Sequence, residues 1–358
     1  MIKKVSVGGF ATYVLTVDGA VYACGYNDFG QLGDGTFVNK SVLTPMIGEG
    51  AVGVEDIVGG YREVIFLKGG AVYFCGYDDF GQAGTGGVPQ LYATPVAAVG
   101  EGASGVDAIA LGAAHALILK SGTVYSTGHN VYGQLGNGLS AARNTYGITT
   151  GAGASGVDGI SAGFYSSYIS KSGALYACGS NVYGQLGINT TLHTANFTAM
   201  VGQGASGITA FEGYQSHMAA LKGDKLYCTG YNASGQLGDG TLVNKKQLTA
   251  AVGEGVSGVT SLGTGNRSDK TFIIKSGAIY WCGYNLNGDA GSGNTLNSRY
   301  LIPMINEGTS LCTGVSNTAD GNTAVLRYIK PYACGKNTRG QLGDGTLNPS
   351  TVLVSMTF

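Results

Sequence analysis

Five segments of the sequence match the glycine fingerprint G-x-G-x-x-G, which in other folds cradles a dinucleotide. They begin at Gly48, Gly100, Gly151, Gly202 and Gly253. A dinucleotide site needs a helix directly after the glycines, because the helix N-terminus holds the pyrophosphate. Here a strand pattern follows each time, as at residues 106–110, and the segment recurs at a regular interval. We therefore interpret the fingerprints as connections within a repeat and expect no cofactor.

The cysteines suggest disulfide or metal chemistry at first sight. Five of the seven occupy one position in successive segments: Cys24, Cys75, Cys178, Cys282 and Cys334. Equivalent strands of neighbouring sheets should lie roughly 10–15 Å apart, whereas a disulfide needs Cα atoms within about 7 Å. Cys228 and Cys312 are isolated in register, and no C-x-x-C or H-x-x-x-H occurs. We expect buried, reduced thiols and no zinc site.

Calcium and catalytic chemistry are also poorly supported. Three aspartate-glycine pairs lack the alternating carboxylates of a calcium loop and are typical of turns; they begin at Asp34, Asp239 and Asp344. His115 and His217 share one register position, where packing is the usual role. His129 and His193 lie in loops without a matching acid and nucleophile. We predict that the chain is not an enzyme.

Composition excludes several other classes of protein. Glycine supplies 64 of 358 residues without a three-residue period, and apolar residues supply 44% of the chain, so it is neither collagen-like nor disordered. A net charge of −1 argues against nucleic acid as a partner. No stretch approaches about 18 uncharged apolar residues, which argues against membrane insertion. Lys3 and Lys4 precede a segment that matches later ones, so we expect cytoplasmic synthesis without a signal peptide.

Internal repetition indicates which elements position these residues. Seven segments read alike, from CGYNDFGQLGDGT at Cys24 to CGKNTRGQLGDGT at Cys334. Their leading glycines are Gly25, Gly76, Gly128, Gly179, Gly230, Gly283 and Gly335, with successive spacings of 51, 52, 51, 51, 53 and 52 residues. Seven such units account for the whole chain, so we interpret residues 1–358 as one domain.

Each unit is expected to form four strands. In the third unit these cover residues 106–110, 115–120 and 123 to about 127, followed by a long loop with Gly133-Gln134-Leu135-Gly136 and a fourth strand. Ser121-Gly122 is typical of a hairpin turn. Small four-stranded sheets must stack to bury both faces, and a closed ring protects their edges. The sequence predicts an all-β, seven-bladed β-propeller of four-stranded antiparallel blades, closed between residues 2–7 and 351–356. An open solenoid is the alternative.

The signature G-x-x-H, an apolar strand, a turn and then G-x-N-x-(Y/F)-G-Q-L-G-x-G resembles the regulator of chromosome condensation repeat in all seven units. That family usually has tryptophan where the five cysteines, Thr127 and Thr229 stand. The sixth unit has Asp289-Ala290 for Gln-Leu, and the seventh has residues 327–330 for its hairpin turn, so these two blades are the weakest matches. Residues 103–109 also resemble a segment of β-lactamase inhibitory protein II, which shares the fold.

The chain meander predicts two chemically different faces. The loop face carries the first-to-second and third-to-fourth strand loops of every blade, and the turn face carries the hairpins and the connections between blades. Candidate partner-binding residues on the loop face are Phe10, Tyr61, Phe164, Tyr165 and Tyr214 before second strands, and Phe29, Phe80, Tyr132 and Tyr183 in the later loops. Tyrosine and phenylalanine bury large areas at low entropic cost, so we expect a protein partner here. For the last four residues, packing between blades is the favoured alternative.

The turn face repeats a cation in one register, at Lys68, Lys120, Lys171, Lys222, Lys275 and Arg327. Its connections carry Glu49, Glu101, Glu254 and Glu307. We expect these charges to neutralise one another in exposed pairs, each contributing ~0–1 kcal/mol. A cationic ring that binds an anionic partner is the less favoured interpretation.

These observations predict a non-enzymatic protein-binding or structural propeller. Its low charge suits surface recognition or decoration within a larger assembly, such as a phage virion. The family resemblance implies a second hypothesis, guanine nucleotide exchange on a small GTPase, which uses an inserted β-wedge. The near-constant spacing leaves no room for that wedge. Enzyme inhibition is a third hypothesis, suggested by the second resemblance.

Overall fold

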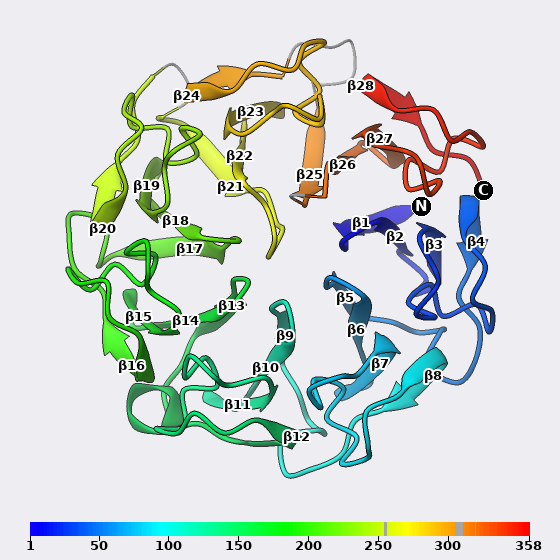
Figure 1. The fold of residues 1–358 in the computed structure, drawn as a ribbon, viewed down its shortest axis with the longest axis horizontal. Coiled ribbons are helices and arrows are strands. Elements are labelled where there is room, and N and C mark those ends of the chain that lie inside the picture. Colours follow the sequence, from blue (N-terminus) through cyan, green and yellow to red (C-terminus); the bar gives the residue numbers. More distant parts are fainter. Residues whose placement is uncertain (254–255, 305–310, 319) are drawn as a thin grey trace.

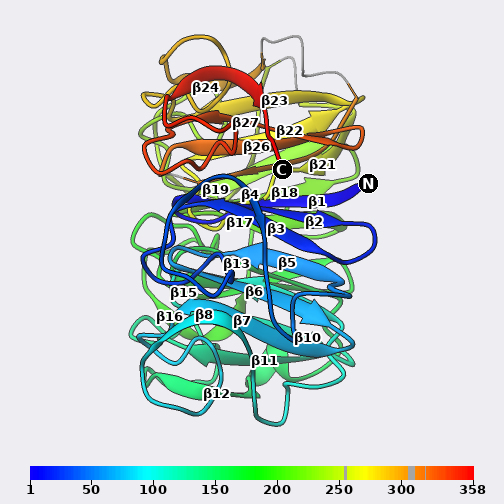
Figure 2. The same ribbon diagram turned by 90° about the vertical axis from the view of Figure 1, so that its right-hand side faces the viewer.

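The computed structural model describes residues 1–253, 256–304, 311–318 and 320–358. Seven four-stranded antiparallel sheets stand around a central axis, and the described part of the chain contains one short 3-10 helix, η1 (Gly151–Ala154). Figure 1 shows the closed ring, and Figure 2 shows it edge-on. The predicted seven-bladed propeller is confirmed. Glu254, Gly255 and Glu307 lie outside the described residues.

Each blade is a meander that runs outward from the axis. The first, innermost strands are β1 (Ile2–Val7), β5 (Asp56–Gly59), β9 (Ala108–Leu111), β13 (Gly159–Ala162), β17 (Ile208–Gly213), β21 (Val259–Leu262) and β25 (Cys312–Asn317). The second strands are β2 (Ala11–Thr16), β6 (Glu63–Lys68), β10 (His115–Lys120), β14 (Ser166–Lys171), β18 (His217–Lys222), β22 (Lys270–Lys275) and β26 (Asn322–Arg327). Because these strands are buried on both faces, their sequences are mostly apolar without alternation.

The outer two strands complete each sheet. The third strands are β3 (Val21–Gly25), β7 (Ala71–Tyr77), β11 (Thr123–Gly128), β15 (Ala174–Gly179), β19 (Lys225–Gly230), β23 (Ala278–Gly283) and β27 (Lys330–Gly335). The fourth strands are β4 (Lys40–Pro45), β8 (Leu91–Ala97), β12 (Arg143–Ile148), β16 (Thr194–Ala199), β20 (Lys245–Ala250), β24 (Ser298–Pro303) and β28 (Ser350–Ser355). Their sequence order in every sheet equals their spatial order.

Sequence predicted the strand ends closely, with one instructive difference. In the third blade the first strand begins at Ala108, not at Val106. The backbone N–H of Val106 instead donates to the carbonyl of Gly70, in the hairpin turn of the preceding blade, at 3.0 Å. The hairpin itself is as expected: Ser121 and Gly122 both have positive φ, at 48° and 72°, the left-handed conformation that a tight two-residue turn needs. Connections therefore tie each blade to its neighbour's turn.

The hydrophobic core is divided among the interfaces between blades. Seven buried clusters each join residues of two adjacent blades. The cluster that closes the ring packs Val5, Val7 and Val14 of the first blade against Leu326 and Leu342 of the last. The first and last blades are separate sheets, so apolar packing rather than a shared sheet closes the propeller. The predicted meeting of the chain ends is confirmed.

The repeat signature is structural in each blade. In the third blade, Asn130 Oδ1 accepts from the backbone N–H of Leu135 at 2.9 Å, and its Nδ2 donates to the carbonyls of Leu139 and Ala141. Gln134 Oε1 accepts from the backbone N–H of Tyr132 at 3.1 Å. These amides satisfy the backbone of the long third-to-fourth strand loop, which has no ladder partner of its own. The signature asparagine and glutamine thus fix the loop backbone, and other side chains of the loop face solvent.

Several smaller predictions are also resolved. All seven cysteines are buried with free thiols. Asp34 Oδ1 accepts from the backbone N–H of Thr36 at 3.0 Å, as in a turn. On the turn face, Lys120 and Lys171 donate to main-chain carbonyls, at 3.2 and 2.8 Å, and not to the expected glutamate carboxylates. No helix in the described ranges has the length and hydrophobicity of a membrane span.

Candidate functional site

A loop of the sixth blade reaches across the axis on the loop face. Strand β21 ends at Leu262 and β22 begins at Lys270, which leaves seven residues where the first five blades have three. We call residues 263–269 the plug (yellow, reaching the centre in Figure 1). Buried Asn266 fixes it, because its Nδ2 donates to the carbonyls of Leu111 and, at 3.3 Å, Gly112 of the third blade. The plug therefore ties distant blades together.

Arg267 of the plug stands among side chains from three other blades. Its Nε lies 3.2 Å from Asp320 Oδ2 of the seventh blade, in an ion pair that is mostly shielded from solvent. Its guanidinium carbon lies 3.7 Å from the ring centre of Tyr61 in the second blade and 4.9 Å from that of Phe164 in the fourth. A guanidinium stacked on two rings is a cation–π arrangement. It holds two of the predicted binding aromatics in place.

Around the plug, aromatic rings form two separate series of contacts. Phe164 contacts Tyr165, with ring centres 4.4 Å apart, and Tyr165 contacts Tyr132 at 5.3 Å. In the first blade, Phe10 contacts Tyr26 at 6.1 Å, and Tyr26 contacts Phe29 at 5.6 Å. We call this surface the aromatic surface; its members are Phe10, Tyr26, Phe29, Tyr61, Tyr77, Phe80, Tyr132, Phe164, Tyr165 and Tyr183.

The four aromatics of the later loops each touch a ring of the next blade. Phe29 lies 5.3 Å from Tyr77, Phe80 lies 4.7 Å from His129, Tyr132 lies 5.0 Å from His193 and Tyr183 lies 4.7 Å from Tyr231. Phe80 and Tyr183 nevertheless remain 42% and 38% exposed. These two rings therefore bridge neighbouring blades and face solvent at the same time.

Tyr214 differs from the other predicted residues. It is only 1% exposed, and its hydroxyl donates to the carbonyl of Gly263, the first residue of the plug, at 2.8 Å. Its ring stacks on that of His217 with centres 4.6 Å apart, and burial raises the pKa of its phenol. The sequence prediction missed this because Tyr214 lies in the register of Gly60 and Gly112, one residue before that of Tyr61 and Phe164. This residue supports the plug and does not contribute to the aromatic surface.

Three hollows open on the aromatic surface. The first, about 400 Å³ in volume, is lined by Phe10, Tyr26, Phe29, Tyr61, Arg62, Lys336, Thr338 and Arg339. A second, about 180 Å³, lies between Tyr61, Phe80 and Phe164. A third, about 250 Å³, lies between Tyr132, Tyr165 and Tyr183. Aromatic walls with a few polar groups are typical of binding sites rather than of plain surface.

Beneath the plug, a small polar cavity of about 120 Å³ occupies the axis. Glu212 lines it, accepting hydrogen bonds from Ser161 Oγ at 3.2 Å and from the backbone N–H of Gly265 at 3.4 Å. Burial raises the pKa of Glu212 to about 7. In the described part of the chain, no three His, Cys, Asp or Glu side chains are grouped so as to hold a metal ion. The lining of the cavity also includes the Lys4–Asp56 ion pair and the hydroxyl groups of Ser6 and Ser316.

Sequence reasoning missed the plug and the arginines on the aromatic surface. The signal was present but small: the spacing between Gly230 and Gly283 is 53 residues, the longest of the six. The two additional residues lie between Gly265 and Lys270, where the first five blades have two residues in place of four. Tyr26 and Tyr77 were also missed, although they stand directly before the signature asparagine or aspartate.

Sequence models of the regulator of chromosome condensation (RCC1) repeat match residues 2–31 and 106–134, and a second model of the same repeat matches residues 18–67. These stretches include the first blade and the plug-facing part of the third, with the amide-bonded loops described above. The chain is an RCC1-repeat β-propeller. The resemblance noted in the sequence is therefore confirmed for this repeat.

Relatives of this RCC1-repeat propeller include proteins of very different size. Human E3 ubiquitin-protein ligase HERC2 is 28% identical over 352 residues, which cover 92% of this chain but only 7% of the ligase. The ultraviolet-B receptor UVR8 of Arabidopsis thaliana is 26% identical over 357 residues, covering 95% of this chain and 78% of the receptor. The chain thus spans a small part of the ligase and most of the receptor.

Solved structures confirm the fold. Human WBSCR16 superposes with a TM-score of 0.80 at 20% identity, covering 93% of this chain and 94% of that one. Yeast RCC1 (Prp20), in its crystal structure with Kap60, superposes with a TM-score of 0.79 at 17% identity, covering 94% and 83%. At these identities the likeness shows a common architecture.

Proposed function

We propose that this chain is a non-enzymatic protein-binding propeller whose partner docks on the aromatic surface of the loop face. The observation that carries the proposal is the concentration of partly exposed rings with Arg62 and Arg267 around three hollows. Tyrosine and arginine are enriched in the energetically dominant residues of protein interfaces. Rings already fixed by the plug and by neighbouring blades lose little entropy on binding.

Relatives support this class of function. The yeast propeller Prp20 was crystallised with Kap60 bound, and a second structural study of Prp20p describes its binding properties to Gsp1p and histones. We carry over the general role, binding of a protein, and not the identity of those partners. Ubiquitin ligase activity is not proposed for this chain, because it covers so little of HERC2.

The proposal has a finer form, in which the partner belongs to a larger assembly such as a virion. Its support is the low charged fraction of 11%, since exposed charge would be desolvated at a cost inside an assembly. We expect the chain to co-sediment with particles from its native source. Nucleotide exchange on a small GTPase is the alternative, and release of labelled nucleotide from a GTPase on addition of the chain would favour it instead.

Affinity capture from the native source, followed by mass spectrometry and a titration with the purified partner, tests the general proposal. Changing Tyr61, Phe164 and Tyr165 together to Ala should weaken binding at least ~10-fold, because each ring lies at the centre of the surface. Tyr328→Asn is the matched control, since Tyr328 is exposed on the opposite, turn face at a positive φ that Asn tolerates. Unchanged binding by a folded triple variant would place the site elsewhere.

A further inference from the structure

The largest of the three hollows lies between the seventh, first and second blades and is strongly cationic. Rings of Phe10, Tyr26, Phe29 and Tyr61 form its walls. Arg62, Lys336 and Arg339 line it as well, whereas no carboxylate does. In the part of the chain that the structure describes, this hollow therefore combines three positive charges with four aromatic rings.

The charge arises from the seventh blade's departure from the repeat. Lys336 stands in the register of Tyr26, and Arg339 stands in the register of Phe29. Blade seven thus presents two cations where blade one presents two rings, and ring closure places both sets side by side. Arg62 adds a third cation from the first-to-second loop of the second blade.

These cations have no carboxylate partner among the ion pairs of the described residues. They contact rings instead: the guanidinium carbon of Arg62 lies 4.7 Å from the centre of Phe29 and 4.8 Å from that of Tyr61. That of Arg339 lies 5.1 Å from the centre of Tyr26. Contact with a ring uses none of the N–H donors of a guanidinium, and two of these donors can bind a carboxylate in parallel bonds.

Several other cations among the described residues are already engaged. Arg267 is paired with Asp320, and the turn-face lysines Lys120 and Lys171 donate to carbonyls. Asp28 is hydrogen-bonded to the side chain of Tyr26, which lines the hollow, whereas Asp79 is hydrogen-bonded to Tyr77 and lines the second hollow with it. An apolar or basic occupant would desolvate three cations without compensation, at a cost that an acidic occupant avoids.

We propose that this hollow binds an acidic segment of the protein partner, with a glutamate or aspartate carboxylate between Arg62, Lys336 and Arg339 and a neighbouring apolar side chain against the rings. The assignment rests on the proposed function and specifies the partner's chemistry. Its volume of about 400 Å³ falls in the range of pockets that enclose a compact ligand group. Charge complementary to Arg62, Lys336 and Arg339 is the feature that selects this occupant.

The test uses a fluorescent random copolymer of glutamate and tyrosine, which presents many acidic and aromatic sequences at once. Fluorescence anisotropy of the full chain should show binding that weakens as salt is raised, because exposed charge pairs are screened. Combined Arg62→Gln, Lys336→Gln and Arg339→Gln changes should weaken binding at least ~10-fold. Combined Lys120→Gln, Lys171→Gln and Lys222→Gln changes remove the same charge from the turn face and should alter affinity less than ~2-fold.

Several results would overturn the assignment. These are absence of binding, equal losses in the two triple variants, or much tighter binding of a copolymer whose tyrosines carry phosphate. A dimer in analytical ultracentrifugation that the hollow variant dissociates would assign the hollow to a second copy. If the aromatic variant loses the captured partner but the hollow variant retains it, the proposed function stands and the acidic-segment assignment fails.

Discussion

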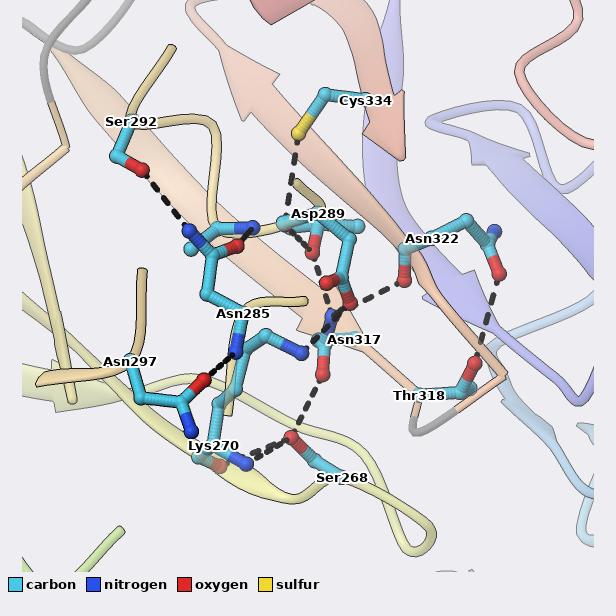
Figure 3. Close-up of polar contacts among 12 residues, drawn as sticks. Ser268, Lys270, Asn285, Asp289, Ser292, Asn297, Asn317, Thr318, Asn322 and Cys334 are labelled. Carbon is cyan, nitrogen blue, oxygen red and sulfur yellow. Dashed lines mark hydrogen bonds and ion pairs between the residues drawn. The ribbon is translucent and has the colours of Figure 1, made fainter. Parts of the chain in front are cut away.

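Blades three and six have the same four-stranded architecture but different side chains at two positions of the repeat. In blade three, His115 Nε2 lies 3.0 Å from Ser167 Oγ of the next blade, and Gln134 closes the signature loop. In blade six, Lys270 and Asp289 replace these residues and form a fully buried ion pair at 2.7 Å. Figure 3 shows this pair within a polar cluster that includes Ser268 and Asn317.

The comparison separates two kinds of departure from the repeat. Lys270 and Asp289 compensate each other, so blade six keeps its architecture: Thr323 Oγ1 still donates to the main-chain carbonyl of Asp289, as Ser167 does to that of Gln134. The two-residue lengthening before Lys270 has no such compensation within the blade, and it produces the plug. Paired departures preserve the fold, whereas unpaired ones change the loop face.

Breaking the compensated pair should have the largest effect on stability. Lys270→Met leaves the Asp289 carboxylate buried without its ammonium partner, and we expect the free energy of unfolding to fall by about 3–5 kcal/mol. Denaturant unfolding followed by circular dichroism measures this loss.

The control restores the pattern of the regular blades by combining Lys270→His with Asp289→Gln. The introduced imidazole would face Thr323 as the His217 imidazole faces Thr271 at 3.0 Å. This double variant should be much more stable than Lys270→Met. A double variant as unstable as the single one would show that the two departures are not coupled.

In blade two, an acid stands at the register of His115 and Lys270, and it forms no ion pair with the described residues. Glu63 is 2% exposed, its Oε2 accepts from the backbone N–H of Arg62 at 2.9 Å, and burial raises its pKa to about 8. An unfolded chain releases this proton near the ordinary value of 4.5, whereas the folded chain holds it until about pH 8. Between these values the folded state binds more protons, so this group's contribution to stability declines as pH rises.

Glu63→Gln should remove that decline. Relative to the parent chain, its free energy of unfolding should increase by at least ~1 kcal/mol between about pH 5 and pH 8. Parallel denaturation curves at the two pH values measure the difference. A constant difference across the window would mean that Glu63 titrates normally in the folded protein.

The smallest expected change concerns the plug. Arg267→Ala removes the ion pair with Asp320 and the stacking on Tyr61 and Phe164, and we expect a loss of about 1–2 kcal/mol in stability. Partner binding should weaken more than stability does, because two rings of the aromatic surface lose their support. Arg267→Lys keeps the charge and serves as the comparison. Equal partner affinity for all three chains would show that the plug does not organise the surface.

The fold was predictable because it depends on features that repeat. The glycine spacing holds across all seven units, and each unit keeps at least one of the two signature amides, so blade number, strand order and ring closure followed from the sequence. The site was only partly predictable, because it depends on contacts between blades distant in sequence. Arg267 and Tyr61 are separated by about four blades, and nothing in either local sequence indicates that they touch. Tyr214 was misplaced because its register differs by one residue from that of Tyr61 and Phe164.

Hydrogen–deuterium exchange of the chain with and without its captured partner tests the central claim most directly. If the aromatic surface is the docking site, residues 8–10, 26–39, 60–62 and 163–165 should become protected, while the hairpin turns at residues 18–19, 121–122 and 172–173 should exchange unchanged. Protection confined to the turn face, with the aromatic loops exchanging as in the free chain, would contradict the account.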